Sequence, residues 1–145
     1  MTQQDKDLLL RDLCARLPYG VKVNISAVSP NRYDEYVPSI NDATINAINL
    51  NTEKCNFKEF YWDNYIVNVR PYLRPMSSMT EKECYELHYI RSSFTDNWKY
   101  IKTPIPLSIA NYNQVDWLNS HHLDYRGLIE KGLAIAVTDE NNPYK

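Results

Sequence analysis

The segment that decides the fold class is Val21-Lys22-Val23-Asn24-Ile25-Ser26-Ala27. Its apolar residues alternate with polar ones, and a period of two is typical of a β-strand with one buried face. The preceding segment, 5–17, carries leucines at helical spacing and is ended by Pro18. A helix followed directly by a half-buried strand predicts an α+β protein.

The first half of the chain contains further strand signals. Short apolar or alternating runs predict strands at 33–37, 43–50, 57–62 and 65–69. Turn residues separate these runs at Asn41-Asp42 and at Asp63-Asn64. We therefore expect the N-terminal helix to be followed by an antiparallel β meander of four to five strands. Pro71 and Pro75 then predict a stiff connector, because each proline restricts the residue before it.

Two helices are expected in the second half. Thr80 and Glu83 have the spacing of a capping box, which predicts a helix from Glu81 to about residue 91. Asn113 is a suitable N-cap for a third helix over 114–122.

The chain is expected to form a single domain over 1–145. A protein of 145 residues buries roughly 70% of its unfolded surface, and its 43% hydrophobic and 23% charged residues are ordinary for a globular protein. Possible sub-lobes are 1–70, mainly β, and 71–137, mainly α, with a final strand at 133–137. The polar segment 138–145 is expected to fray.

Charge and cysteine content exclude several classes. Each half of the chain carries eight Lys or Arg against nine Asp or Glu, so no basic half exists to hold a phosphate backbone. Three widely spaced cysteines indicate neither a disulfide framework nor a zinc site. Without a signal-peptide pattern or a long apolar run, we expect a cytoplasmic protein that does not use a membrane.

Chemically versatile side chains are concentrated between Val115 and Ile135. This block contains two of the three histidines and two of the three glycines. The candidate binding residues in it are Trp117, His121, His122, Asp124, Tyr125, Arg126 and Lys131. We expect the block to be rigid, with Gly127 and Gly132 in left-handed conformations or at positions of close contact, and with an outer face that recognises a partner.

The two histidines admit a functional and a structural interpretation. On a helix, adjacent side chains diverge by about 100° and cannot chelate one metal ion together. One of them could act as a base oriented by Asp124 or Asp116. The interpretation we favour is structural: one histidine caps the C-terminal end of the helix, and the other packs locally.

Arg126 likewise has two interpretations. Its guanidinium could hold a phosphate or carboxylate. We favour instead an internal role, either in an ion pair with Asp124 or stacked on a tyrosine, with Gly127 giving the turn its freedom.

Aromatic residues and one cysteine complete the candidates. The aromatic set that could stack on bases comprises Tyr61, Trp62, Tyr65, Tyr89, Trp98, Tyr100 and Trp117. Such residues more often pack in a sheet, and together with arginine they also characterise protein interfaces. Cys84 and His88 have nucleophile–base spacing, but a buried cysteine is the favoured interpretation. No P-loop, Rossmann, HExxH or GxSxG pattern is present, so we expect no catalytic residue, metal or cofactor.

Three blocks of sequence resemble a known family in the same order along the chain. They are CARLPYGV at 14–21, RPYLRPMSSMTE at 70–81 and LNSHHLDYRGLIEKGLA at 118–134. They are similar to blocks of a family of small proteins encoded by phages and prophages of gut Bacteroides-type bacteria. No activity is established for that family, so the resemblance implies a mobile-element origin and expression in the bacterial cytoplasm, and it transfers no catalytic residue.

The sequence thus leads to three hypotheses. The first is a non-enzymatic phage accessory protein that binds a protein partner, from host or phage, through the segment 121–131 and neighbouring aromatic residues. The alternative is a small nucleic-acid-binding or nucleic-acid-processing module that uses His121, His122, Asp124 and Arg126. The third is an oligomeric scaffold. The sequence leaves the oligomeric state open.

Overall fold

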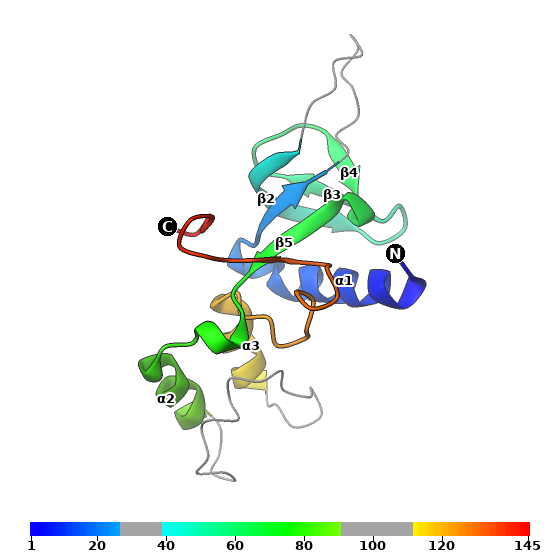
Figure 1. The fold of residues 1–145 in the computed structure, drawn as a ribbon. Helices are drawn as coiled ribbons and strands as arrows, with labels where there is room; N and C mark the ends of the chain where they lie inside the picture. Colours follow the sequence, from blue (N-terminus) through cyan, green and yellow to red (C-terminus); the bar gives the residue numbers. More distant parts are fainter. Residues whose placement is uncertain (27–38, 91–111) are drawn as a thin grey trace.

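The computed structural model describes residues 1–26, 39–90 and 112–145. The predicted α+β class is confirmed: an N-terminal helix, α1 (Gln3–Arg16), packs on a mostly antiparallel sheet, and the helices α2 (Glu81–Ile90) and α3 (Tyr112–Ser120) lie on the other side of α1 from the strands (Figure 1). The predicted strand at 33–37 lies outside the described residues, as do Trp98, Tyr100 and the side chains of His88 and Tyr89.

Helix α1 begins two residues before the predicted start. Thr2 is its N-cap, and the Thr2 hydroxyl accepts a hydrogen bond of 3.1 Å from the backbone N–H of Asp5. Leu9 and Leu13 are fully buried and point into the core. After a short 3-10 turn, Gly20 reverses the chain in the left-handed conformation that favours glycine, with φ of 66°.

The strands of the described residues form one mixed sheet. They are β1 (Lys22–Ile25), β2 (Ile40–Asn49), β3 (Lys54–Phe57), β4 (Asp63–Tyr65), β5 (Val69–Leu73) and β6 (Ile135–Ala136). Their order in the sheet is β4-β3-β2-β1-β5-β6. The first four form the predicted antiparallel meander, whereas β5 adds to the free side of β1, and β6 pairs with β5 in parallel.

The predicted turn at Asn41-Asp42 is wrong, because both residues lie inside β2. Val23 pairs with Ala43 and Ile25 with Ile40, so two residues of β2 face one residue of β1. This is a β-bulge, and Asp42 adopts a left-handed φ of 63° within it. The Asn-Asp signal therefore marks an irregular backbone conformation and not a reversal of the chain.

The predicted strand at 57–62 is also wrong. Strand β3 ends at Phe57, and the loop that follows folds back so that Phe60 and Trp62 pack against the core. Asp63-Asn64, predicted as a hairpin turn, belongs instead to β4. The predicted strand at 65–69 is replaced by a 3-10 turn, Ile66–Asn68, that leads into β5.

Pro71 lies inside β5 and is not part of a connector. The backbone N–H of Ser26 donates to the Asn68 carbonyl at 2.8 Å, and hydrogen-bonded rungs alternate in an antiparallel ladder. The alternation makes Val23 and Pro71 a non-hydrogen-bonded pair. Pro71, which has no N–H, therefore loses no hydrogen bond to β1. It also loses none to β6, because β5 pairs with β6 only from Tyr72 onward.

The capping box of α2 is confirmed. The Thr80 N–H donates to Glu83 Oε2 at 2.9 Å, and the Glu83 N–H donates to the Thr80 hydroxyl at 3.2 Å. The N-cap role predicted for Asn113 is wrong, because α3 already includes Tyr112.

Buried side chains form two clusters. The first lies between α1 and the sheet, and the second joins α2 and α3 to the segments after β5 and after α3. The division between the two clusters does not fall at residue 70 of the sequence, because Leu128, Leu133 and Ala134 belong to the first cluster. Among the described residues, none of the helices has the length and apolar character needed to cross a membrane.

The segment 138–145, which we expected to fray, is hydrogen-bonded to the sheet through Tyr144. The Tyr144 hydroxyl accepts a hydrogen bond from the Lys22 N–H at 3.1 Å and donates one to the Tyr72 carbonyl at 2.8 Å. Burial raises the pKa of Tyr144 strongly. An aromatic side chain thus fastens a polar segment whose composition alone predicts disorder.

Candidate functional site

Helix α3 ends in a Schellman motif at the start of the candidate block. The Leu123 N–H donates to the Leu118 carbonyl at 3.1 Å, and the His122 N–H donates to the Asn119 carbonyl at 3.1 Å. His122 occupies the left-handed position, with φ of 56°. Leu118 and Leu123 are both fully buried, which supplies the apolar contact that accompanies this motif.

His121 caps the last turn of the helix. Its Nδ1–H donates to the Trp117 carbonyl at 2.8 Å, and its ring stacks on the Trp117 ring at 3.9 Å between centroids. Ser120 Oγ lies 3.1 Å from the same nitrogen. The expectation that one histidine caps the helix is confirmed.

His122 packs, as expected of the other histidine. Its ring stacks on the Tyr144 ring at 3.9 Å, with an interplanar angle of 10°. Burial, with a smaller contribution from the positive charges of Arg16, His121 and Arg74, lowers the pKa of His122 to about 4. The ring is therefore neutral at pH 7. The two histidines face different neighbours and do not form a joint site.

Asp124 organises the turn that follows. Its two carboxylate oxygens accept hydrogen bonds from the N–H groups of Leu128 at 2.9 Å and Ile129 at 2.8 Å. The expected ion pair between Asp124 and Arg126 is wrong, because Arg126 pairs instead with Asp12 of α1 at 2.9 Å. Asp124 is occupied by backbone donors, which satisfies a buried carboxylate without a side-chain cation.

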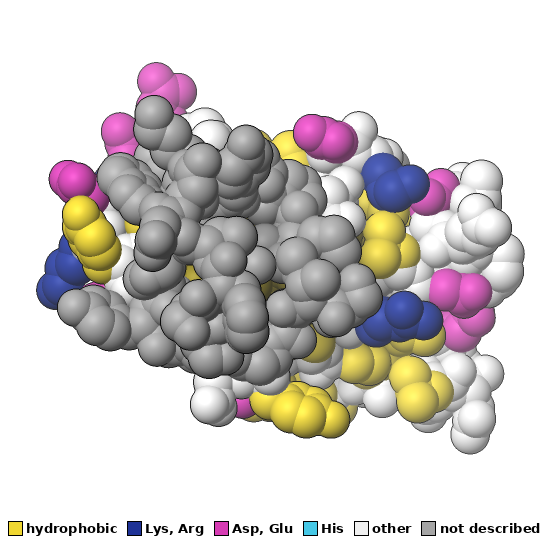
Figure 2. All heavy atoms as spheres, turned by 90° about the horizontal axis from the view of Figure 1, so that it is seen from below, with side chains coloured by type: hydrophobic (Ala, Val, Ile, Leu, Met, Phe, Trp, Pro, Cys, Tyr) yellow, Lys and Arg dark blue, Asp and Glu magenta, His cyan; other side chains and the backbone are white. Residues whose placement is uncertain are grey.

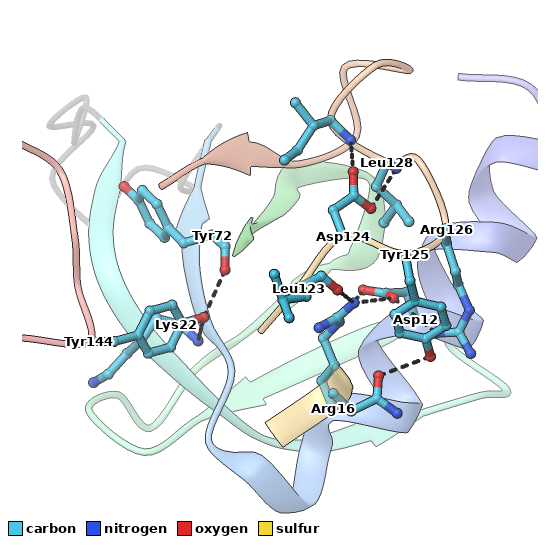
Figure 3. Close-up of polar contacts among 12 residues, drawn as sticks. Asp12, Arg16, Lys22, Tyr72, Leu123, Asp124, Tyr125, Arg126, Leu128 and Tyr144 are labelled. Atoms are coloured by element: carbon cyan, nitrogen blue, oxygen red, sulfur yellow. Dashed lines mark hydrogen bonds and ion pairs between the residues drawn. The ribbon is translucent and has the colours of Figure 1, made fainter. Parts of the chain in front are cut away.

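Asp12 is the centre of a buried cluster that joins the two ends of the chain (Figure 3). Arg16 approaches it side-on, through Nε at 2.8 Å and Nη2 at 3.0 Å. The same Nη2 donates to the Leu123 carbonyl at 2.7 Å. With Arg126 on its other side, one carboxylate serves two guanidinium groups. We call Asp12, Arg16 and Arg126 the arginine–aspartate cluster.

Tyr125 lies against both arginines of this cluster. Its ring centroid is 5.4 Å from the Arg16 guanidinium carbon and 4.7 Å from that of Arg126, so the expected stacking of Arg126 on a tyrosine is confirmed. The Tyr125 hydroxyl donates to Asn119 Oδ1 at 3.0 Å, and burial raises its pKa. Tyr125 is 2% exposed and the Arg126 side chain 8%. Neither residue is therefore available on an outer face.

Asp12 and Arg16 were not among the candidate residues expected from the sequence. Both are fully buried charged residues on the face of α1 that also carries Leu9 and Leu13. The signal was present, because helical spacing places residues 9, 12, 13 and 16 on one side of the helix. Charged residues on an apolar helix face require buried partners, and the sequence does not show where those partners come from.

The remaining candidates are peripheral. Lys131 is exposed, and its Nζ lies 3.7 Å from Asp5 Oδ1. Cys84 is buried, as expected. In the ranges that the structure describes, no group of three or more His, Cys, Asp or Glu residues is arranged to hold a metal ion. The candidate block thus divides into a helix cap, a turn and an internal ion-pair cluster.

A second candidate surface lies at the β4 edge of the sheet. Tyr61 is 100% exposed, and its two neighbours in the chain, Phe60 and Trp62, stack on each other with 4.7 Å between ring centroids. Tyr65 on β4 is also exposed, and the Lys54 ammonium lies 4.9 Å from its ring centroid. We call Phe60, Tyr61, Trp62 and Tyr65 the aromatic hairpin.

Comparison of the chain with protein-family models, with curated proteins and with solved structures finds no match.

Proposed function

We propose that this protein is a non-enzymatic protein-binding module and that the aromatic hairpin is its contact surface. The observation that carries the proposal is the complete exposure of Tyr61, whose chain neighbours Phe60 and Trp62 stack on each other. Tyrosine and tryptophan supply much of the energy of protein interfaces, because they bury large area with few rotatable bonds. Trp62 also packs against the core, so the surface rests on a fixed support.

The proposal moves the contact surface away from 121–131. Asp124 accepts hydrogen bonds from backbone N–H groups, Tyr125 donates to Asn119 and Arg126 pairs with Asp12, so all three side chains are engaged inside the molecule. Substitution of these three residues would destabilise the fold, so a loss of binding in such variants would not identify a contact surface. The non-enzymatic character is supported by the contacts of the same region, since His121, Asp124 and Arg126 are held by internal hydrogen bonds and the His122 ring is stacked on Tyr144.

A protein partner fits the surface charge better than a nucleic acid. Arg126 is paired with Asp12, and Arg74 donates two hydrogen bonds to Glu83, at 2.9 and 2.7 Å. On the face seen in Figure 2, the described basic and acidic side chains are interspersed. Nucleic-acid binding relies on an excess of unpaired cations, which the net charge of −2 does not provide.

The biological setting that we propose is an accessory role for a phage or prophage in the cytoplasm of its bacterial host. The three sequence blocks at 14–21, 70–81 and 118–134 support this setting. The partner would then be a host or phage protein.

The test compares two exposed tyrosines. Tyr61→Ala removes the centre of the aromatic hairpin, whereas Tyr112→Ala removes a tyrosine that is 91% exposed on α3 and serves as the matched control. A partner captured from host lysate by the wild type is purified and titrated against each variant by calorimetry. We expect Tyr61→Ala to weaken binding by about tenfold or more and Tyr112→Ala to leave it unchanged.

Two results would contradict the proposal. Equal affinities of Tyr61→Ala and wild type would remove the aromatic hairpin as the contact surface. Binding of labelled oligonucleotides that weakens steeply with salt, together with no protein partner, would favour the nucleic-acid alternative.

A further inference from the structure

At one residue pair of the β1–β5 ladder, a side-chain hydroxyl bridges the backbone groups of the two strands. The alternation that leaves Pro71 unbonded to β1 makes Lys22 and Tyr72 the next hydrogen-bonded pair. The Tyr144 hydroxyl lies between them, accepting from the Lys22 N–H and donating to the Tyr72 carbonyl (Figure 3). A donor and an acceptor from adjacent strands thus converge on one phenolic hydroxyl.

One side of the position that the Tyr144 ring occupies is formed by His122, which follows α3. The His122 ring lies parallel to the Tyr144 ring, and the Schellman motif fixes its backbone. The Arg74 N–H also donates to the His122 carbonyl at 2.7 Å, which ties this side to the end of β5. Neither the Arg74–His122 hydrogen bond nor the hydrogen bonds of the Schellman motif involve residues 138–145. The position is therefore held in place by elements other than its occupant.

Residues 138–145, here called the strap, make their hydrogen bonds to distant parts of the chain through one side chain. Within the part of the chain that the structure describes, the hydrogen bonds between the strap and distant elements both run through the Tyr144 hydroxyl. The other bonds are local, such as that from the Thr138 N–H to Asn141 Oδ1. The ion pair between Lys145 and Asp139 is exposed and long, at 4.0 Å. Segments with so few buried contacts open at lower free energy than the core.

We propose that the Lys22 N–H, the Tyr72 carbonyl and the His122 ring form a tyrosine-binding site, and that the strap is its displaceable intramolecular occupant. When the strap leaves, a tyrosine in an extended segment of a partner protein takes its place. Selectivity comes from the hydroxyl, because a phenylalanine would leave the donor and the acceptor unpaired. The tethered strap holds the site closed through its high effective concentration.

This site is separate from the aromatic hairpin. The aromatic hairpin lies at the β4 edge, whereas Tyr144 binds across β1 and β5 toward the opposite edge of the sheet. A test that contradicts one of the two proposals therefore leaves the other unaffected.

The experiment uses the full chain with Tyr144→Ala and a synthetic peptide of residues 138–145. We expect the peptide to bind this variant and to shift the Lys22 amide resonance. A peptide with phenylalanine in place of the tyrosine should bind at least about tenfold more weakly. Tyr112→Ala, which removes an exposed tyrosine elsewhere and keeps the strap, should bind the peptide no better than the wild type.

Absence of peptide binding to Tyr144→Ala, or equal binding of the two peptides, would overturn the proposal. If Tyr144→Ala does not fold, hydrogen exchange on the unaltered chain decides. A displaceable strap lets the Lys22 amide exchange by a local opening that is independent of denaturant, while the Asn24 amide in the neighbouring rung exchanges more slowly. Exchange of both amides through global unfolding alone would overturn it.

Discussion

Arg126 and Asp12 are 114 positions apart in the chain and are joined by a partly buried hydrogen bond of 2.9 Å. The bond ties the loop after α3 to the middle of α1, and Arg16 completes the contact from the other side. Two cations around one buried carboxylate make this a point at which loss of a single group leaves uncompensated charge.

We expect Asp12→Ala to be among the most destabilising substitutions in the chain. It would leave two guanidinium groups without their carboxylate, at a cost of about 3–5 kcal/mol in the free energy of unfolding. Urea denaturation measures this. Asp63→Ala is the matched control, since its ion pair with Lys54 is exposed and should contribute less than about 1 kcal/mol. Similar costs for both variants would contradict the role given to the arginine–aspartate cluster.

Stability is expected to fall in mild acid because of His122. Its folded-state pKa of about 4 lies below the ordinary 6.5, so between these values the unfolded chain binds a proton that the native protein does not. The contribution of neutral His122 is complete above pH 6.5 and is lost as the pH falls toward 4. Urea midpoints at a series of pH values measure the slope.

His122→Asn should flatten that slope, because asparagine tolerates the left-handed conformation and does not titrate. His121→Asn is the control, since it keeps the Schellman position and the buried ring of His122 and removes only a minor contribution to its lowered pKa. A slope that persists in His122→Asn would assign the acid sensitivity to another group.

Asp124→Ala should destabilise the protein although it removes no ion pair. The N–H groups of Leu128 and Ile129 would each lose their acceptor, and an unsatisfied buried donor costs about 1–3 kcal/mol. Asp124→Asn keeps one carbonyl oxygen and should cost less. Thermal unfolding of the two variants separates these outcomes, and an unchanged melting temperature for Asp124→Ala would show that the turn does not depend on the carboxylate.

Thr80→Ala should destabilise α2 by about 0.5–2 kcal/mol through loss of its N-cap. The Thr80 hydroxyl accepts the Glu83 N–H, while the Glu83 carboxylate also binds Arg74 and therefore stays ordered. Thr80→Ser retains the hydroxyl and should behave as the wild type. Equal stability of the alanine and serine variants in urea would contradict the cap.

Local patterns predicted the elements that depend on neighbouring residues. The leucines of α1 and the alternation of β1 follow directly from helical and strand periodicity, and the capping box of α2 from residue spacing. The same patterns misplaced the strands around the aromatic hairpin. There, Phe60 and Trp62 stack on each other in a loop instead of alternating along a strand. In the sequence, a run of aromatic residues looks the same in both cases.

By itself, the sequence determined the α+β class, the histidine cap at the end of α3 and the charge balance, because each depends on composition or on contacts a few residues apart. Only the tertiary structure decided that Arg126 pairs with Asp12 instead of Asp124, and that Tyr144 fastens a polar segment to β1 and β5. Those partners lie 72 to 122 positions apart. Which buried charge or hydroxyl meets which acceptor is fixed by how the sheet and helices pack, and no local spacing carries that information.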